Sequence, residues 1–348
     1  MKAVVLSGGD GRRMQPFTSS MPKQLLPVAG RPVLQRLLET LAGAGVHEVA
    51  VVVGSWAPEV RRAIGDGSAS GVCVTYIEQP TPAGLAHAVG LAQEFLGDED
   101  FVLALGDNLF GEDAVSDLLR LAATRPACGL LVREVGDPRA YGVAEVTGEG
   151  RVLRVLEKPS QPPTNLAVTG MYYFSSLVHA SIATLTPSPR GELEITDAIQ
   201  DLIGRGHRVE AHRFEGYWRD IGHSDDVVLA NGELLGELER DIAGEVDDTS
   251  TVVGDVVVEA GAEVHGSHIV GPALVRSWAR LTDCVVGPGT TIGEGACLTG
   301  VHLENSVVLA GTRLQLATGL RGCVIAPQDH PVQANPRHQA AEATVGAR

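Results

Sequence analysis

The N-terminal part of the chain reads KAVVLSGGDGRR at residues 2–13 and PKQLLP at residues 22–27. The apolar run at residues 2–6 predicts a buried strand, and a glycine-rich loop follows it directly. Three glycines within four positions leave few side chains in the way, so backbone N–H groups can approach an anion closely. Arg13 and Lys23 add full positive charges on either side. The stretch therefore predicts a strand followed by a loop that binds a polyphosphate.

Two familiar phosphate-binding loops do not match this stretch. A dinucleotide fingerprint needs a third glycine three residues after Gly11, where Met14 stands. A P-loop needs Gly-Lys-Ser/Thr, which the stretch lacks. A tight glycine turn at the surface is the alternative interpretation, and the flanking positive charges favour the phosphate site over it.

Up to about residue 225 the chain alternates apolar, strand-like runs with amphipathic stretches of helical spacing. The predicted strands and helices are, in chain order, residues 2–6, 33–42, 48–53, 58–64, 72–77, 83–95, 101–105, 114–123 and 128–133. Such alternation indicates parallel strands joined by crossover helices. Ligands of such sheets bind at the carboxyl ends of the strands. We therefore expect the glycine-rich loop and the Gly-Asp-Asn turn at residues 106–108 to lie there.

Beyond residue 134 the pattern changes. Residues 141–146 and 152–156 predict a β-hairpin, residues 167–174 a further strand, and residues 224–242 an acidic helix that connects two domains.

Residues 250 to about 325 are rich in valine, glycine and threonine and contain no long helical run. Aliphatic residues recur six apart in three tracts, which are Val252, Val258, Val264 and Val270, then Val286, Ile292 and Leu298, then Val308, Leu314 and Leu320. A six-residue period of inward aliphatic residues is typical of a parallel β-helix, in which each hexad forms one face of a triangular coil. A β-sandwich with chance spacing is the weaker alternative.

The composition excludes several classes of protein. The formal net charge of −16 over 348 residues argues against a surface that binds nucleic acid or an anionic membrane. The five cysteines include no Cys-x-x-Cys pair, so we expect neither a disulfide framework nor a structural zinc site. No apolar run reaches 18 residues and the N-terminus has no signal-peptide layout, so we expect a cytoplasmic protein without a membrane span.

Several motifs, taken together, resemble those of the sugar-1-phosphate nucleotidyltransferases, in particular the long members that carry a C-terminal β-helix. The motifs are LSGGDGRRMQPFTSSMPKQLLPVAGRP (6–32), EQPTPAGLAHAV (78–89), LGDN (105–108), YGVAEV (141–146), EKP (157–159), NLAVTGMYYF (165–174), RGELEITDAI (190–199) and YWRDIGH (217–223). The resemblance covers residues 1 to about 320. It implies a Rossmann-like α/β nucleotidyltransferase domain with a mostly parallel sheet at residues 1–240, and a short left-handed parallel β-helix at residues 241–325. We expect the polar tail at residues 326–348 to be mobile.

The implied reaction joins dTTP or UTP to α-D-glucose 1-phosphate and releases pyrophosphate. The sugar phosphate oxygen attacks the α-phosphorus in line, so positioning and charge neutralisation carry the catalysis. Asp107 and Asp220 match the family's ligands for Mg²⁺, which takes one or two carboxylates together with phosphate oxygens. The resemblance also implies a homo-oligomer that the β-helix mediates.

On the nucleotide side, the resemblance implies that the triphosphate is bound by a loop made of Leu6, Gly8, Gly9 and Gly11. Arg13 and Lys23 would stabilise charge on the transferring and leaving phosphates. Asp10 and Arg12 replace the lysine and threonine that are common in this loop. The match extends to the base, which Gln79, Gly84 and Leu85 would bind. A glutamine amide offers a donor and an acceptor, which suits the O4/N3–H edge of thymine or uracil.

On the sugar side, the matching residues are Gly142, Glu157, Lys158, Val168, Gly170 and Tyr172. Glu157 would accept hydrogen bonds from sugar hydroxyls, and Lys158 would pair with the incoming phosphate. Arg190 and Glu192 would border the site.

Three other interpretations stay open. The enzyme could prefer another base or sugar, which the pocket around Gln79 would decide. The β-helix could serve an acyltransferase, for which His265, His268 and His302 are the candidate residues. A non-catalytic regulatory subunit is disfavoured, because the charged residues of the implied site are all present.

Overall fold

The computed structural model describes residues 1–9, 11, 14–15 and 21–327. The described residues form two compact units. The first contains residues 1–9 and 33–220, and the second contains residues 11, 14–15, 21–32 and 221–327. Among the described residues, no helix has the length and apolar character needed to cross a membrane.

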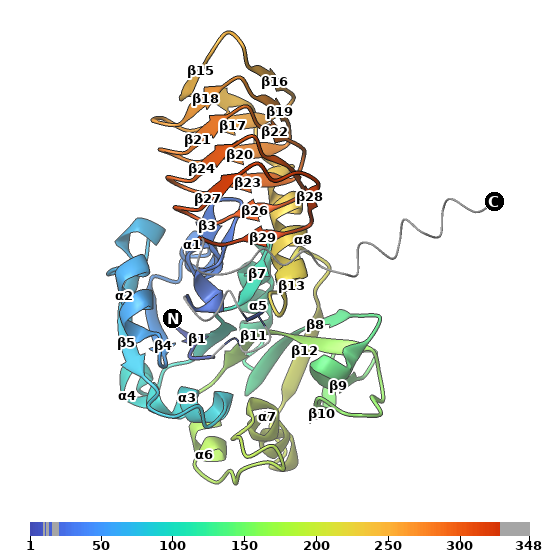
Figure 1. Ribbon diagram of the computed structural model, residues 1–348. Coiled ribbons are helices and arrows are strands. Elements are labelled where there is room, and N and C mark those ends of the chain that lie inside the picture. The colour runs from blue at the N-terminus through green and yellow to red at the C-terminus, as the bar shows by residue number, and fades with distance from the viewer. Residues whose placement is uncertain (10, 12–13, 16–20, 328–348) are drawn as a thin grey trace, which may run out of the picture. The chain divides into compact units, whose positions relative to one another are not determined.

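The first unit is built on a nine-stranded sheet. Its strands are β1 (Lys2–Ser7), β4 (Glu48–Val53), β5 (Cys73–Glu78), β6 (Phe101–Leu105), β8 (Cys128–Glu134), β9 (Gly142–Val146), β10 (Val152–Glu157), β11 (Leu166–Phe174) and β12 (Val209–Arg213). The main order is β10-β9-β11-β6-β1-β4-β5, with β8 paired to β11 and β12 (Figure 1). β1 pairs in parallel with β4 and β6, and β4 with β5, as the sequence predicts. β9 and β10 form the predicted hairpin. A separate two-stranded ribbon joins β7 (Asn108–Phe110) to β13 (Trp218–Asp220).

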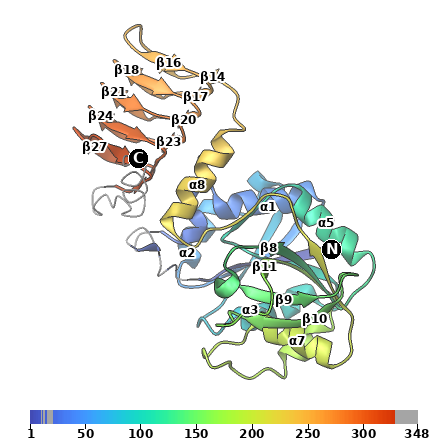
Figure 2. The same ribbon diagram turned by 90° about the vertical axis from the view of Figure 1, so that its right-hand side faces the viewer.

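Helices cover both faces of this sheet. They are α1 (Val33–Gly43), α2 (Ala57–Ile64), α3 (Leu85–Leu91), α4 (Gln93–Leu96), α5 (Asp113–Ala122), α6 (Val178–Ile182) and α7 (Ile195–Gly204), with short 3₁₀ turns η4 (Ser68–Ser70) and η5 (Pro138–Ala140). Figure 2 shows α3 and α7 on one side of the sheet and α5 on the other. Alternate residues of the strands, such as Val4 and Leu103, form one buried core with apolar residues of α3 and α7, because successive side chains of a strand point to opposite faces. The single helix predicted at residues 83–95 is divided in two at Ala92.

The second unit contains the predicted β-helix. Its strands are β14 (Asp241–Ile242), β15 (Glu245–Val246), β16 (Thr251–Val253), β17 (Val256–Val258), β18 (Glu263–His265), β19 (His268–Val270), β20 (Ala273–Val275), β21 (Arg280–Thr282), β22 (Val285–Val286), β23 (Thr290–Ile292), β24 (Cys297–Thr299), β25 (His302–Glu304), β26 (Val307–Val308), β27 (Arg313–Gln315), β28 (Leu320–Arg321) and β29 (Val324–Ile325). They form three parallel sheets, and Figure 1 shows their coils stacked from orange to red.

The same unit contains three elements outside the coils. They are η3 (Lys23–Leu25), the hairpin of β2 (Pro27–Val28) and β3 (Arg31–Pro32), and helix α8 (Ser224–Leu235), which packs against β2, β23, β26 and β29. The sequence predicts helix up to Ile242, but Asp241 and Ile242 already form the first strand of the coils.

One predicted inward residue of the β-helix is wrong. Val252 pairs across the coils with Ile269, which is fully buried, whereas Val270 pairs with the exposed Val253 and is itself only half-buried. Most coils repeat after 17 residues, as the pairing of Thr251 with His268 and of His268 with Val285 shows. A strict hexad period requires 18 residues for three faces, so one corner of the coil is one residue shorter. This shorter corner also explains the breaks in the six-residue period.

Candidate active site

Asp107 and Asp220 come from distant parts of the chain and meet at one amide. Asp107 follows β6 directly, and Asp220 ends β13, where it pairs with Asn108 of β7. The Nδ2 amide of Asn108 donates to Oδ1 of Asp107 over 2.9 Å and to Oδ1 of Asp220 over 3.5 Å. The two candidate metal ligands are therefore held on the same side chain.

Asn108 is a residue that the sequence analysis missed as a member of the site, although it belongs to the LGDN motif. Its side chain is only 2% exposed. The indole Nε1 of Trp218 donates to its Oδ1 over 2.8 Å, which orients the amide so that Nδ2 faces the carboxylates. The ring of Trp218 also packs edge-on against Tyr141, with centroids 5.6 Å apart.

The donor set at this position suits Mg²⁺. Carboxylate oxygens are hard ligands, and Mg²⁺ usually takes one or two of them and completes its shell with phosphate oxygens and water. Among the described residues, no group of three or more His, Cys, Asp or Glu side chains could hold a metal ion. A complete metal cage of protein side chains is therefore not present in this part of the chain, and two carboxylates are what a metal shared with a phosphate substrate requires.

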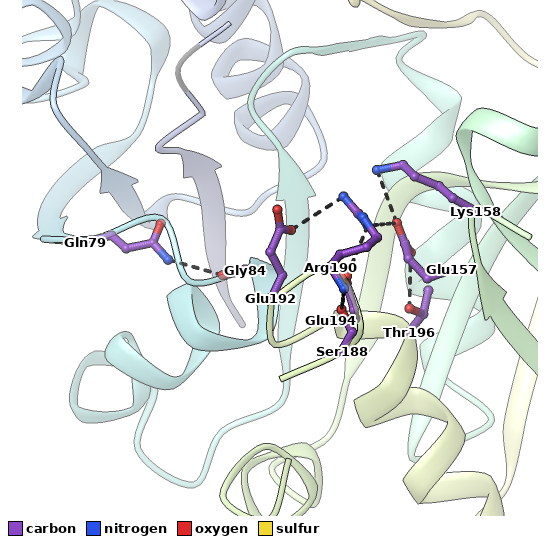
Figure 3. Close-up of polar contacts among 9 residues, drawn as sticks. All are labelled: Gln79, Gly84, Glu157, Lys158, Ser188, Arg190, Glu192, Glu194 and Thr196. Atoms are coloured by element: carbon purple, nitrogen blue, oxygen red, sulfur yellow. Dashed lines mark hydrogen bonds and ion pairs between the residues drawn. The ribbon is translucent and has the colours of Figure 1, made fainter. Parts of the chain in front are cut away.

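Glu157 lies at the centre of a second polar group, at the end of β10 (Figure 3). Its Oε1 is 3.3 Å from Nζ of Lys158 and accepts a hydrogen bond from Nη1 of Arg190 over 3.1 Å. Its Oε2 accepts from Oγ1 of Thr196 over 3.1 Å. Lys158 has a φ of +40°, a left-handed conformation that is strained for a residue with a side chain, and its backbone N–H donates to the carbonyl of Tyr141 over 3.0 Å.

The acidic groups around Glu157 influence one another. Burial and then the charge of Glu157 raise the pKa of Glu194, and the same two causes raise the pKa of Asp197. Glu194 is only 3% exposed, and its Oε1 accepts hydrogen bonds from Arg190 and from Ser188, each over 3.0 Å (Figure 3). Arg190 therefore ties the carboxylates of Glu157 and Glu194 together.

The other predicted sugar-side residues surround this group. A Cβ on Gly142 would lie 3.0 Å from Cγ2 of Thr196 and 3.7 Å from Oε2 of Glu157, so a side chain there would crowd the carboxylate. Tyr172 is buried, and burial followed by the charge of Glu157 raises the pKa of its hydroxyl. Val168 and Gly170 lie in β11, where the pairing with β8 changes register between Val168 and Tyr172.

Gln79 follows β5, and its side chain is held by the start of α3. Its Nε2 donates to the carbonyl of Gly84 over 3.2 Å and lies 3.0 Å from Nδ1 of His87 (Figure 3 shows the contact with Gly84). Its Oε1 is 3.0 Å from the position that a Cβ on Gly8 would occupy. His87 is therefore more than a packed helix residue, since it helps to orient Gln79.

Gly84 has a structural reason that the sequence did not reveal. Its φ is +104°, and a Cβ there would lie 2.4 Å from the backbone oxygen of Leu193. The backbone of Leu193 in turn bonds to Ala83 and Ala86. The glycine therefore admits a neighbouring chain segment, which carries Glu192 and Glu194, and Leu85 begins α3 directly after it.

The glycine-rich loop begins at the carboxyl end of β1. Leu6 is buried there, and its carbonyl accepts a hydrogen bond from the N–H of Gly106 over 2.9 Å. This bond joins the start of the loop to the Gly-Asp-Asn turn, as the position of both after parallel strands predicts. Gly8 is half-buried and Gly9 exposed. Gly11 and Lys23 belong to the second unit, and Arg13 lies outside the described residues, as do Asp10 and Arg12.

Known proteins match the chain over most of its length. The family model described as nucleotidyl transferase matches residues 2–237. A glucose-1-phosphate thymidylyltransferase of Streptomyces antibioticus is 44% identical over 93% of this chain and 92% of its own. A solved putative glucose-1-phosphate thymidylyltransferase of Bacillus anthracis, in complex with a sucrose, is 33% identical, with a TM-score of 0.62 over 67% of this chain and 94% of that one. A UDP-glucose pyrophosphorylase complexed with UDP-glucose is 25% identical, with a TM-score of 0.62 over 68% of this chain and 100% of that one.

Proposed function

Because this chain belongs to the nucleotidyl transferase family, we propose that it transfers a nucleotidyl group from dTTP or UTP to α-D-glucose 1-phosphate. The observation that carries the proposal is the meeting of Asp107 and Asp220 at Asn108, because a phosphate-activating metal needs such a pair. The Streptomyces relative and the neighbour bound to UDP-glucose support the thymidine and uridine alternatives respectively. The comparisons favour nucleotidyl transfer over the acyltransferase alternative.

In the proposed reaction an oxygen of the sugar phosphate attacks the α-phosphorus of the nucleotide. A P–O bond to the sugar phosphate forms as the P–O bond to pyrophosphate breaks. Mg²⁺, when bound by Asp107 and Asp220, supplies charge neutralisation at the phosphates. Lys158 pairs with the incoming phosphate, and Glu157 accepts hydrogen bonds from sugar hydroxyls. The contact of Lys158 with Glu157 supports this division, since it holds the ammonium group beside the proposed sugar site.

We assign the base to Gln79 and the triphosphate to the glycine-rich loop with Arg13 and Lys23. The hydrogen bond from Nε2 of Gln79 to Gly84 supports Oε1 as the acceptor for the N3–H of thymine or uracil. We further propose a catalytic domain at residues 1–240, in keeping with a family match that ends at residue 237. The β-helix at residues 241–325 would mediate assembly into a cytoplasmic homo-oligomer.

The test is release of pyrophosphate by the purified protein with Mg²⁺, glucose 1-phosphate and each common triphosphate in turn. We expect turnover with dTTP or UTP. Asp107→Asn keeps an oxygen that can accept from Asn108 but removes the charge, so it should abolish turnover and leave the fold intact. The exposed Asp98→Asn is the matched control and should behave as the wild type. No turnover with any triphosphate and several sugar phosphates would refute the proposal.

A further inference from the structure

The turn at Ala29 and Gly30, which joins β2 to β3, adopts a strained conformation. Val28 pairs with Arg31, so these two residues form a two-residue hairpin loop. Both have positive φ, +44° for Ala29 and +75° for Gly30. Positive φ at both positions is typical of a type I′ turn, which favours asparagine, aspartate or glycine and is unfavourable for alanine. A strained residue of this kind persists only where its surroundings hold it in place.

The surroundings of this turn come from α8 and the β-helix. Ala29 is buried in an apolar cluster with Leu235 of α8 and Leu274 of β20. Nη1 of Arg276 donates to the carbonyl of Gly30, and a Cβ on Gly30 would lie 2.7 Å from that same nitrogen. Arg276 is itself held by an ion pair of 3.0 Å with Glu259.

Asn231 joins all three parts. It lies within α8 and is fully buried, a costly place for a polar side chain unless its hydrogen bonds are made. Its Oδ1 accepts from the N–H of Ala29 over 3.0 Å and from Oγ1 of Thr291 over 2.7 Å. Its Nδ2 donates to the carbonyl of Gly289 over 2.9 Å. One side chain therefore bonds the turn to the β-helix.

The turn lies close in sequence to Lys23, which opens η3. The residues between them are packed, since Gln24, Leu25, Leu26 and Val28 are all buried. The position of the Lys23 backbone is therefore set by a short buried segment that ends at the strained turn.

We propose that Asn231 is a positioning residue for Lys23, and that α8 and the β-helix thereby serve nucleotide binding in addition to assembly. The inference rests on the proposed function, in which Lys23 contacts the phosphates of the nucleotide. Loss of the bond to Ala29 releases the turn, so Lys23 loses its fixed position while the sugar-side residues keep theirs. The effect should therefore fall on the nucleotide and not on the sugar phosphate.

The test compares Asn231→Leu with Thr291→Val in the full-length protein. Thr291→Val removes one partner of Asn231 and leaves the bond to Ala29. We expect Asn231→Leu to raise the KM for dTTP (or UTP) by about five- to tenfold, the equivalent of one lost hydrogen bond, with the KM for glucose 1-phosphate unchanged. Thr291→Val should keep both KM values. Asn231→Asp retains an acceptor for Ala29 and should restore most of the nucleotide KM.

Hydrogen exchange of residues 21–32 is the second readout and does not depend on turnover. Amides of this segment should exchange faster in Asn231→Leu and at the wild-type rate in Thr291→Val. Unchanged exchange in Asn231→Leu, or an equal rise of both KM values, would overturn the inference. If the wild type turns over no substrate, the proposed function fails. A rise in exchange with no loss of nucleotide affinity, measured by calorimetry with Mg²⁺·dTTP, would then refute the role of Asn231 in binding.

Discussion

Trp218→Phe tests whether the indole N–H positions the candidate metal ligands. The substitution keeps an aromatic ring beside Tyr141 but removes the donor to Oδ1 of Asn108, a bond of 2.8 Å. Asn108 is almost fully buried, so its oxygen would be left without this partner in a place that water reaches poorly. The amide then has no fixed orientation toward Asp107 and Asp220.

The size of the effect follows from the cost of an unmade buried hydrogen bond. That cost is about 1–3 kcal/mol, and about 1.4 kcal/mol corresponds to a factor of ten in rate. If the carboxylates lose their alignment, kcat/KM should fall by roughly 5- to 150-fold. The Mg²⁺ concentration that gives half the maximal rate should rise, because the metal must itself order the two ligands. Substrate KM for glucose 1-phosphate should change little.

The assay measures initial rates of pyrophosphate release over a series of Mg²⁺ concentrations, with Mn²⁺ binding by electron paramagnetic resonance as a readout independent of turnover. Trp278→Phe is the matched control, since Trp278 is 66% exposed and lies in the β-helix. The reasoning would be refuted if Trp218→Phe lowered the melting temperature but left the Mg²⁺ dependence and Mn²⁺ affinity of the wild type. Trp218 would then be only a packing residue.

Three further predictions concern stability, each measured by urea unfolding. Gly84→Ala should destabilise the fold by roughly 2–4 kcal/mol, because its Cβ would meet a backbone oxygen at 2.4 Å, whereas Gly97→Ala, with a φ of +62° but open space, should cost only about 1 kcal/mol. Ile269→Ala should cost about 2–4 kcal/mol because it empties a buried position of the coil, and Val270→Ala should cost clearly less. For Glu194, burial and a neighbouring glutamate raise the pKa above its ordinary 4.5, so the native state binds a proton more readily than the unfolded chain and loses stability as the pH rises above 4.5. Glu194→Gln should reduce that loss, and an unchanged pH profile would contradict it.

Local pattern in the sequence was enough to predict the elements of the fold. β4 and β6 have the predicted bounds, Glu48–Val53 and Phe101–Leu105, because continuous apolar runs of this length are typical of buried parallel strands. The six-residue period likewise predicts the β-helix, since each hexad must bury one aliphatic side chain. The one-residue error at Val270 arose because a corner of the coil can shorten without any local sign. The pairing between coils decides which residue points inward.

The residue types of the site were also visible in the sequence, and so was the adjacency of two of its loops. Parallel strands bring their carboxyl ends to one edge, which predicted that the loop after β1 and the turn after β6 would meet. The sequence could not reveal how Asp220 reaches Asp107, because that depends on the antiparallel pairing of two three-residue strands far apart in the chain. For the same reason Asn108 and Trp218 were missed.

The amino-acid sequence by itself thus determined the strands, the coils, the family and the charged residues of the candidate site, because each is encoded in neighbouring positions. Only the tertiary structure decided which side chains hold those residues in place. Gly84 is required by a chain segment more than a hundred residues away, and Ala29 is held in a strained turn by Asn231, some two hundred residues later. Such contacts satisfy buried polar groups and close approaches between distant backbones, and they leave no periodic pattern in the chain.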